Sequence, residues 1–279
     1  MLEIKKRGRP SHADIAARAQ AQVKVQRTDA EVLRDLQDRF GMLDKLTKAS
    51  LGANIRSLVV TGAPGVGKTY TVEQVLENTP NAKFEIVKGG LSAVNLYKLG
   101  WRNRKAGNVV VLDDADGIFL DEDALNILKA LCDSSPIRRV SWLKESASLK
   151  EEDIPTSYDF HGSFIFISNL DFQKYVDMGG NKYVAHFEAL MSRSLYLDLR
   201  LFDRQAISLW INHIATAGKM FAKEEVSDEL GTEILDWVAD HRDDLRELSL
   251  RTTVKLIQLA KGNPTEWPRM AEVLLCRSN

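Results

Sequence analysis

Apolar positions along the chain follow two spacings, one typical of buried strands and one typical of helices. Five short runs are apolar at all or nearly all positions, as strands covered on both faces are. They occupy residues 58–60, 84–87, 109–112, 164–167 and 195–199. Between several of these runs, apolar residues recur every three to four positions, the period of a helix with one buried face. These helical stretches cover residues 93–104, 123–132 and 183–191. The alternation predicts an α/β fold in which helices cover both faces of a parallel sheet.

The two ends of the chain lack strand signals. Thr28 and Glu31 have the spacing of a capping box, which predicts that a helix begins near residue 28. Beyond residue 201 the pattern is helical only. Four helices are expected there, at residues 203–217, 227–241, 248–261 and 264–275. The pattern therefore predicts three parts: a tail of residues 1–27, a core of residues 28–201 and a helical domain of residues 202–279.

Composition is that of an ordinary globular protein, with 44% hydrophobic and 28% charged residues. No apolar run is long enough to span a membrane, and the charged N-terminus lacks the apolar stretch of a secretory signal. Cys132 and Cys276 lie far apart within helical patterns, which favours buried, reduced thiols and a cytoplasmic location. The tail carries seven Lys/Arg against two acidic residues (+5), so the remainder is −6 in a chain of net charge −1. Basic tails of this kind often contact polyanions.

The strongest motif follows the first apolar run. Residues 62–69 read Gly-Ala-Pro-Gly-Val-Gly-Lys-Thr, the P-loop pattern, between an expected strand and an expected helix. The glycines let backbone N–H groups wrap phosphates at a helix N-terminus, while Lys68 reaches the β- and γ-phosphates and Thr69 binds Mg²⁺. A glycine-rich turn with a chance Gly-Lys-Thr is the alternative, which the flanking elements disfavour. The expected nucleotide-binding residues are Gly62, Ala63, Pro64, Gly65, Val66, Gly67, Lys68, Thr69 and Tyr70.

Two acidic residues end the third apolar run, about forty residues after the P-loop. We expect Asp113 to lie beside the P-loop and to hold Mg²⁺ together with Thr69. Asp114, one residue later, would orient the attacking water. Taken alone, the pair could belong to an acidic turn, because Asp116 and further acids follow. Combined with a P-loop, a metal and water site is the better interpretation.

The order of these motifs resembles that of the AAA+ ATPase family over nearly the whole chain outside the tail. Asn169, at the end of the fourth apolar run, resembles sensor 1, which helps to place the lytic water. Arg193, within Ser-Arg-Ser, resembles the arginine finger of clamp-loader subunits, and Arg251 resembles sensor 2, with Arg246 as its competitor. From the residues alone, Asn169 could instead belong to a turn and Arg193 to a surface salt bridge. AAA+ proteins more often have Glu at the position of Asp114, a difference that bears on hydrolysis rather than on binding.

This resemblance implies a five-stranded parallel αβα core with a helical lid, and ATP and Mg²⁺ as cofactors. It also implies a homo-oligomeric ring or spiral, with six subunits as the expected number, because an arginine finger such as Arg193 acts in the neighbouring subunit's site. As a whole, the chain resembles compact AAA+ ATPases of tailed bacteriophages, which would place it in the host cytoplasm.

Two basic segments indicate contact with DNA. The tail contains Arg-Gly-Arg-Pro, the core of an AT-hook, whose extended arginines lie in a narrow minor groove. Residues 138–144 alternate enough to form a β-hairpin arm. A solvated tail and a hairpin that merely packs are the alternatives. The expected DNA-binding residues are Arg7, Gly8, Arg9, Arg138 and Arg139.

The sequence thus predicts an ATPase that loads, remodels or moves on DNA in replication or recombination. A protein-remodelling ATPase, with the tail recruiting a protein client, is the rival class. A slow regulatory NTP switch also stays open, because Asp114 stands where a longer carboxylate is usual.

Overall fold

The computed structural model describes residues 27–180, 184–199, 203–218 and 220–277. The tail residues Arg7, Gly8 and Arg9, and the boundary expected near residue 201, therefore lie outside the described residues. Within the part of the chain that is described, no helix is both long and apolar enough to cross a bilayer.

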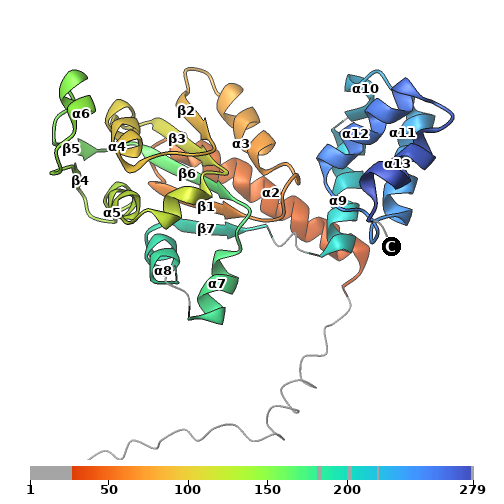
Figure 1. Ribbon diagram of the computed structural model, residues 1–279, viewed down its shortest axis with the longest axis horizontal. Coiled ribbons are helices and arrows are strands. Elements are labelled where there is room, and N and C mark those ends of the chain that lie inside the picture. The colour runs from red at the N-terminus through yellow and green to blue at the C-terminus, as the bar shows by residue number, and fades with distance from the viewer. Residues whose placement is uncertain (1–26, 181–183, 200–202, 219, 278–279) are drawn as a thin grey trace, which may run out of the picture.

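A five-stranded parallel sheet forms the centre of the core, in the order β2-β3-β6-β1-β7 (Figure 1). The strands are β1 (Ser57–Thr61), β2 (Lys83–Lys88), β3 (Asn108–Asp113), β6 (Ser163–Ser168) and β7 (Leu195–Asp198). This confirms the predicted sheet. The order puts β1, which leads into the P-loop, directly beside β6, which leads into Asn169. Because all five strands run the same way, their carboxyl ends meet at one edge, where ligands of open α/β sheets bind.

Two apolar clusters cover the two faces of the sheet, because successive residues of a strand point to opposite sides. Leu58 and Val60 of β1 belong to the cluster that also contains side chains of α2 (Asp29–Leu51) and α3 (Lys68–Glu77). Val59 belongs to the other cluster, with side chains of α4 (Ala93–Arg102), α5 (Glu122–Leu131) and α8 (Val184–Arg193). The runs of β1, β3 and β6 are therefore strands buried on both faces, as predicted, whereas the edge strands β2 and β7 are only partly buried.

The helices of the core begin close to the expected positions. Thr28 caps α2 with its side chain, and Glu31 bonds back to the Thr28 N–H, so the predicted capping box is present. The α7 helix has only seven residues and was not predicted. The remaining elements on the second face are α4 (Ala93–Arg102), a 3₁₀ turn (Asp116–Leu120), α5 (Glu122–Leu131), α7 (Phe172–Met178) and α8 (Val184–Arg193).

The insertion before β6 forms a two-stranded antiparallel sheet of β4 (Arg138–Ser141) and β5 (Ser157–Phe160), with α6 (Ala147–Glu151) between them. The predicted β-pairing is thus present, but the pair does not form a bare arm. Val140 and Tyr158 are buried in the second cluster, against α4 and α5 (Figure 1). Of the two alternatives, the hairpin that packs describes the structure.

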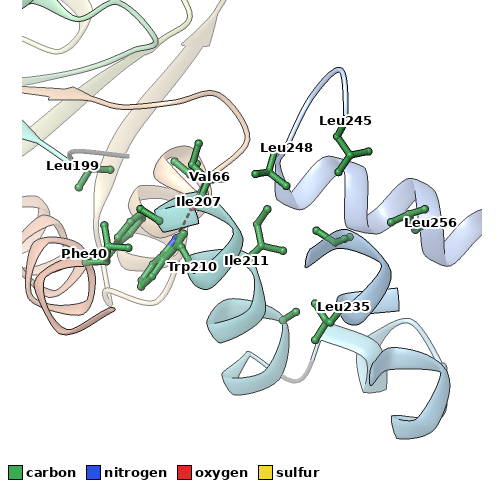
Figure 2. Close-up of a cluster of buried hydrophobic side chains, with 14 of the residues drawn as sticks. Phe40, Val66, Leu199, Ile207, Trp210, Ile211, Leu235, Leu245, Leu248 and Leu256 are labelled. Atoms are coloured by element: carbon green, nitrogen blue, oxygen red, sulfur yellow. Dashed lines mark hydrogen bonds between the residues drawn. The ribbon is translucent and has the colours of Figure 1, made fainter. Parts of the chain in front are cut away.

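All four helices predicted after residue 201 are present, and a fifth, short helix joins them. They are α9 (Arg204–Ala217), α10 (Met220–Lys223), α11 (Asp228–Asp240), α12 (Leu250–Gly262) and α13 (Trp267–Leu275). Their buried side chains continue the first apolar cluster of the core (Figure 2). Phe40 of α2 stacks on Trp210 of α9 with ring centroids 4.2 Å apart. These helices, α9 to α13, are called the lid below, and they are joined to the core through shared apolar packing.

Candidate functional site: a nucleotide-binding cavity between core and lid

The P-loop connects β1 to α3 at the carboxyl edge of the sheet. Gly65 and Gly67 have positive φ of 68° and 100°, a conformation that side chains other than glycine rarely adopt. Gly67 is the N-cap of α3 and offers no side chain to its first turn. The N–H groups at this helix start are consequently left for an external anion, which the helix dipole also favours.

Lys68 is the most constrained charged side chain of the site. It is only 5% exposed, and its Nζ donates to Gly62 O at 2.8 Å, to Ala63 O at 2.8 Å and to Asn169 Oδ1 at 2.7 Å. Burial lowers the pKa of Lys68 to about 8, against the opposing effect of the Asp114 and Asp113 carboxylates. The Lys68 ammonium group is thus held against the P-loop backbone and Asn169 by three hydrogen bonds.

Thr69 and Asp113 meet as predicted for a magnesium site. The Thr69 hydroxyl donates to Asp113 Oδ1 at 2.9 Å, and Asp113 is 7% exposed. Burial raises the pKa of Asp113, while the bond from Thr69 opposes that shift. A hydroxyl and a carboxylate at the start of a phosphate-binding helix are hard oxygen ligands of the kind Mg²⁺ prefers, so these residues fit the ion.

Asn169 joins the two charged groups predicted to act on phosphate and on water. Its Nδ2 donates to Asp114 Oδ1 at 2.6 Å while its Oδ1 accepts from Lys68. Asp114 adopts a positive φ of 52°, and its N–H donates to Ile167 O at 3.1 Å, so the backbone of β6 holds it in place. The structure therefore brings Lys68, Asp114 and Asn169 together, as the motif order predicts.

A cavity of about 280 Å³ opens at this point, between the P-loop and the lid. Tyr70 contributes to its wall, and so does Arg251 from the first turn of α12. Arg246 lies elsewhere, with its N–H bonded to Leu275 O at the end of α13. Of the two lid arginines considered for sensor 2, Arg251 is the one that reaches the cavity.

Arg193 lies at the opposite edge of the sheet. It ends α8, and the next residue, Ser194, shares a hydrogen bond of 2.7 Å with Ser57 at the start of β1. The P-loop begins at the other end of β1, roughly 13 Å away at 3.3 Å per residue. Arg193 Nη1 donates to Ala189 O, and Nε lies 3.9 Å from Asp133. Arg193 therefore lies at the end of the sheet opposite to the cavity of this chain.

Several residues around the cavity were not predicted. Ser168 Oγ donates to Asp116 Oδ1 at 2.7 Å and accepts from Leu170 N–H, and thereby fixes the turn that carries Asn169. Burial raises the pKa of Asp116. The sequence did contain a signal, a third acid two positions after Asp114. Trp210 and Leu250 of the lid also donate hydrogen bonds to the P-loop, which no sequence pattern predicted.

Arg138, which was expected to bind DNA, is buried in the structure. Its side chain is 5% exposed, donates to Leu131 O at 2.9 Å and to Gly162 O at 2.7 Å, and lies over the Phe160 ring. Burial lowers the pKa of Arg138 to about 10. Arg139, by contrast, keeps a side chain 68% exposed beside Asp159. Only the second arginine of this pair is open to a ligand.

The P-loop lies on the strand beside that of Asn169, and a helical domain lies over the cavity, which is the fold that the resemblance to AAA+ ATPases implies. Domain III of the Thermotoga maritima replication initiation protein DnaA has this fold. It matches 86% of this chain and 91% of its own, with a TM-score of 0.50 and 12% identity. The Thermotoga maritima RuvB Holliday junction branch migration motor matches 86% of this chain and 69% of its own, with a TM-score of 0.47 and 13% identity.

A second comparison places the chain more narrowly. A 36.7 kDa protein encoded in the nrdC–mobD intergenic region of Enterobacteria phage T4 is 34% identical over 236 residues. The match covers 84% of this chain and 72% of the phage protein, and this chain belongs to the same protein family. No protein-family model matches the chain.

Proposed function

We propose that this chain binds and hydrolyses ATP in the cavity between core and lid. The observation that carries the proposal is the bridge from Lys68 through Asn169 to Asp114, because it sets a phosphate-binding cation beside a carboxylate able to orient water. Lys68 and the N–H groups of the P-loop bind the phosphates, and Thr69 with Asp113 would hold Mg²⁺. Bound there, the ion would neutralise charge on the β- and γ-phosphates.

The chain's own residues then divide the work on the reaction. Asp114 orients and polarises the attacking water, and Asn169 keeps that carboxylate turned towards the phosphate end of the cavity. Arg251 approaches the same cavity from the lid, where its charge can stabilise the phosphate oxygens.

The position of Arg193 supports an oligomer. An arginine finger has to reach a phosphate, and the opposite edge of the sheet is out of reach of this subunit's own cavity. In a ring or spiral, Arg193 would enter the site of a neighbour and neutralise charge on the γ-phosphate. A hexamer is the assembly we propose, in line with the resemblance to ring-forming AAA+ ATPases.

We further propose that the work is done on DNA. Support comes from the Arg-Gly-Arg-Pro of the tail, from the exposed Arg139, and from the fold shared with a replication initiation protein. The test is phosphate release with Mg²⁺-ATP, measured without DNA, with single-stranded DNA and with duplex DNA. Stimulation by either DNA supports the proposal. Turnover that no DNA raises, but that a protein client does, would assign the chain to protein remodelling instead.

A further inference from the structure

Two consecutive carbonyl groups of the P-loop are held by the lid. Gly65 O accepts a hydrogen bond of 2.9 Å from the backbone N–H of Leu250, at the start of α12. Val66 O accepts one of 2.9 Å from the indole Nε1 of Trp210, on α9. Figure 2 shows the second bond, with Val66 above the Trp210 ring. The loop expected to wrap the phosphates is therefore bonded from two separate lid helices.

The Trp210 ring is firmly fixed in the orientation that makes this bond. The side chain is 2% exposed and stacks on Phe40 of α2 with an interplanar angle of 20°. Val66, Ile207 and Leu199 belong to the same buried cluster (Figure 2). Since close packing leaves no room for the ring to turn, the indole N–H stays aimed at the P-loop.

Holding a carbonyl also orients the amide that follows it. A peptide unit is planar, and in the trans form its C=O and N–H point in opposite directions. Among the described residues no peptide bond is cis. The Val66 carbonyl faces Trp210, so the N–H of Gly67 points away from the lid tryptophan, and Gly67 lines the cavity. By the same geometry, the bond from Leu250 to Gly65 O orients the N–H of Val66.

Glycine makes this restraint consequential. Gly65 and Gly67 flank Val66, and residues without a side chain sample many backbone conformations. A loop of this kind loses conformational freedom when it closes on phosphate, and that loss weakens binding. A hydrogen bond that fixes the peptide unit between Val66 and Gly67 before phosphate binds reduces the conformational freedom that is lost on binding.

We propose that Trp210 is a positioning residue for nucleotide binding: its indole N–H orients the Gly67 amide towards the phosphates. The inference rests on the proposed ATP-binding function and assigns to the lid a part in forming the P-loop itself. Trp210 does not touch the nucleotide in this role, because it acts through the carbonyl of Val66.

The test is Trp210→Phe, which keeps an aromatic ring against Phe40 and removes the indole N–H. We expect the Kd values for ATP, ADP and inorganic tripolyphosphate to rise about tenfold each, the effect of one lost hydrogen bond at a buried carbonyl. The factor should be alike for the three ligands, because each places a phosphate against the Gly67 amide. Calorimetric titration well below the melting temperature measures it, and KM for ATP should rise by the same factor.

Trp237→Phe is the matched control. Trp237 is also a buried lid tryptophan, on α11, but its Nε1 has no hydrogen-bond partner within the described part of the chain. Its removal should leave all three affinities unchanged. If Trp210→Phe binds like the wild type, or if Trp237→Phe weakens binding equally, the positioning role is overturned while ATP binding stands. A wild-type chain that binds none of the ligands overturns the proposed function and this inference together.

Should Trp210→Phe fold poorly, 3-benzothienylalanine at position 210 replaces it. That side chain has the shape of tryptophan with sulfur in place of the N–H, so packing is kept and only the donor is lost. The same tenfold loss is expected. Wild-type affinity in this variant would show that the ring, and not the hydrogen bond, matters.

Discussion

Arg138 and Arg139 are neighbours in the sequence with opposite environments, and exchanging each for alanine should have opposite consequences. Arg138→Ala removes both hydrogen bonds to Leu131 O and Gly162 O and the contact with the Phe160 ring. Two buried carbonyls left without a donor cost about 1–3 kcal/mol each, so we expect a loss of about 2–6 kcal/mol. At about 2 °C per kcal/mol for a chain of this size, that lowers the melting temperature by about 4–12 °C.

Arg139→Ala should leave stability within about 0.5 kcal/mol of the wild type, because an exposed charge near Asp159 contributes little. If the β4–β5 sheet contacts DNA, this variant should instead weaken DNA binding and reduce the salt slope by about 0.9 for one lost phosphate contact. Urea denaturation gives the stabilities, and fluorescence anisotropy with duplex DNA at two salt concentrations gives the affinities. An Arg138→Ala protein as stable as the wild type but defective in DNA binding would refute the reasoning.

Three further predictions concern chemistry, assembly and the tail. Lys68→Ala should abolish tight ATP binding, because Lys68 contacts the charge that the bound phosphates carry before the reaction. Asp114→Asn should keep ATP binding and stop turnover, because Asp114 acts on the attacking water. Undiminished phosphate release by Asp114→Asn would exclude Asp114 as the residue that activates the water. Arg193→Ala should still bind nucleotide but hydrolyse ATP about 10³-fold more slowly. Mixing this variant with Lys68→Ala should restore some ATPase activity. A wild-type hydrolysis rate for Arg193→Ala would contradict an active site shared between neighbouring subunits. Removing residues 1–27 should weaken binding to A·T-rich duplex DNA and flatten its salt dependence, while ATP hydrolysis without DNA persists. Unchanged DNA affinity after truncation would leave Arg139 as the remaining candidate.

The sheet and the phosphate site could be predicted because their signals are local. Uninterrupted apolar runs predict strands buried on both faces, and the P-loop fixes which strand carries the nucleotide. Asn169 follows from the same logic, since a polar residue that ends an apolar strand must lie at the carboxyl edge. The α7 helix was not predicted, because its seven residues form only about two turns, too few to show a helical period.

The burial of Arg138 was not predicted because its charge was considered without the two-residue alternation of the strand. In β4, Arg138 and Val140 share one face and Arg139 and Ser141 share the other, and the first face is buried. Because side chains of a strand alternate between its two faces, Arg138 lies on the same face as Val140. Trp210 could not have been found in this way, because its partner Val66 lies 144 residues earlier in the chain.

The three bonds of Lys68 have a consequence for how phosphate arrives. An ammonium group has three hydrogens, and in this structure each already has an acceptor: two loop carbonyls and the Asn169 amide oxygen. A phosphate oxygen that accepts a hydrogen bond from Lys68 must therefore replace one of these three acceptors. Where Asn169 is the group displaced, its amide oxygen is set free while its nitrogen still contacts Asp114. Phosphate binding in the P-loop would then change, through the side chain of Asn169, the surroundings of Asp114, the carboxylate proposed to orient the water.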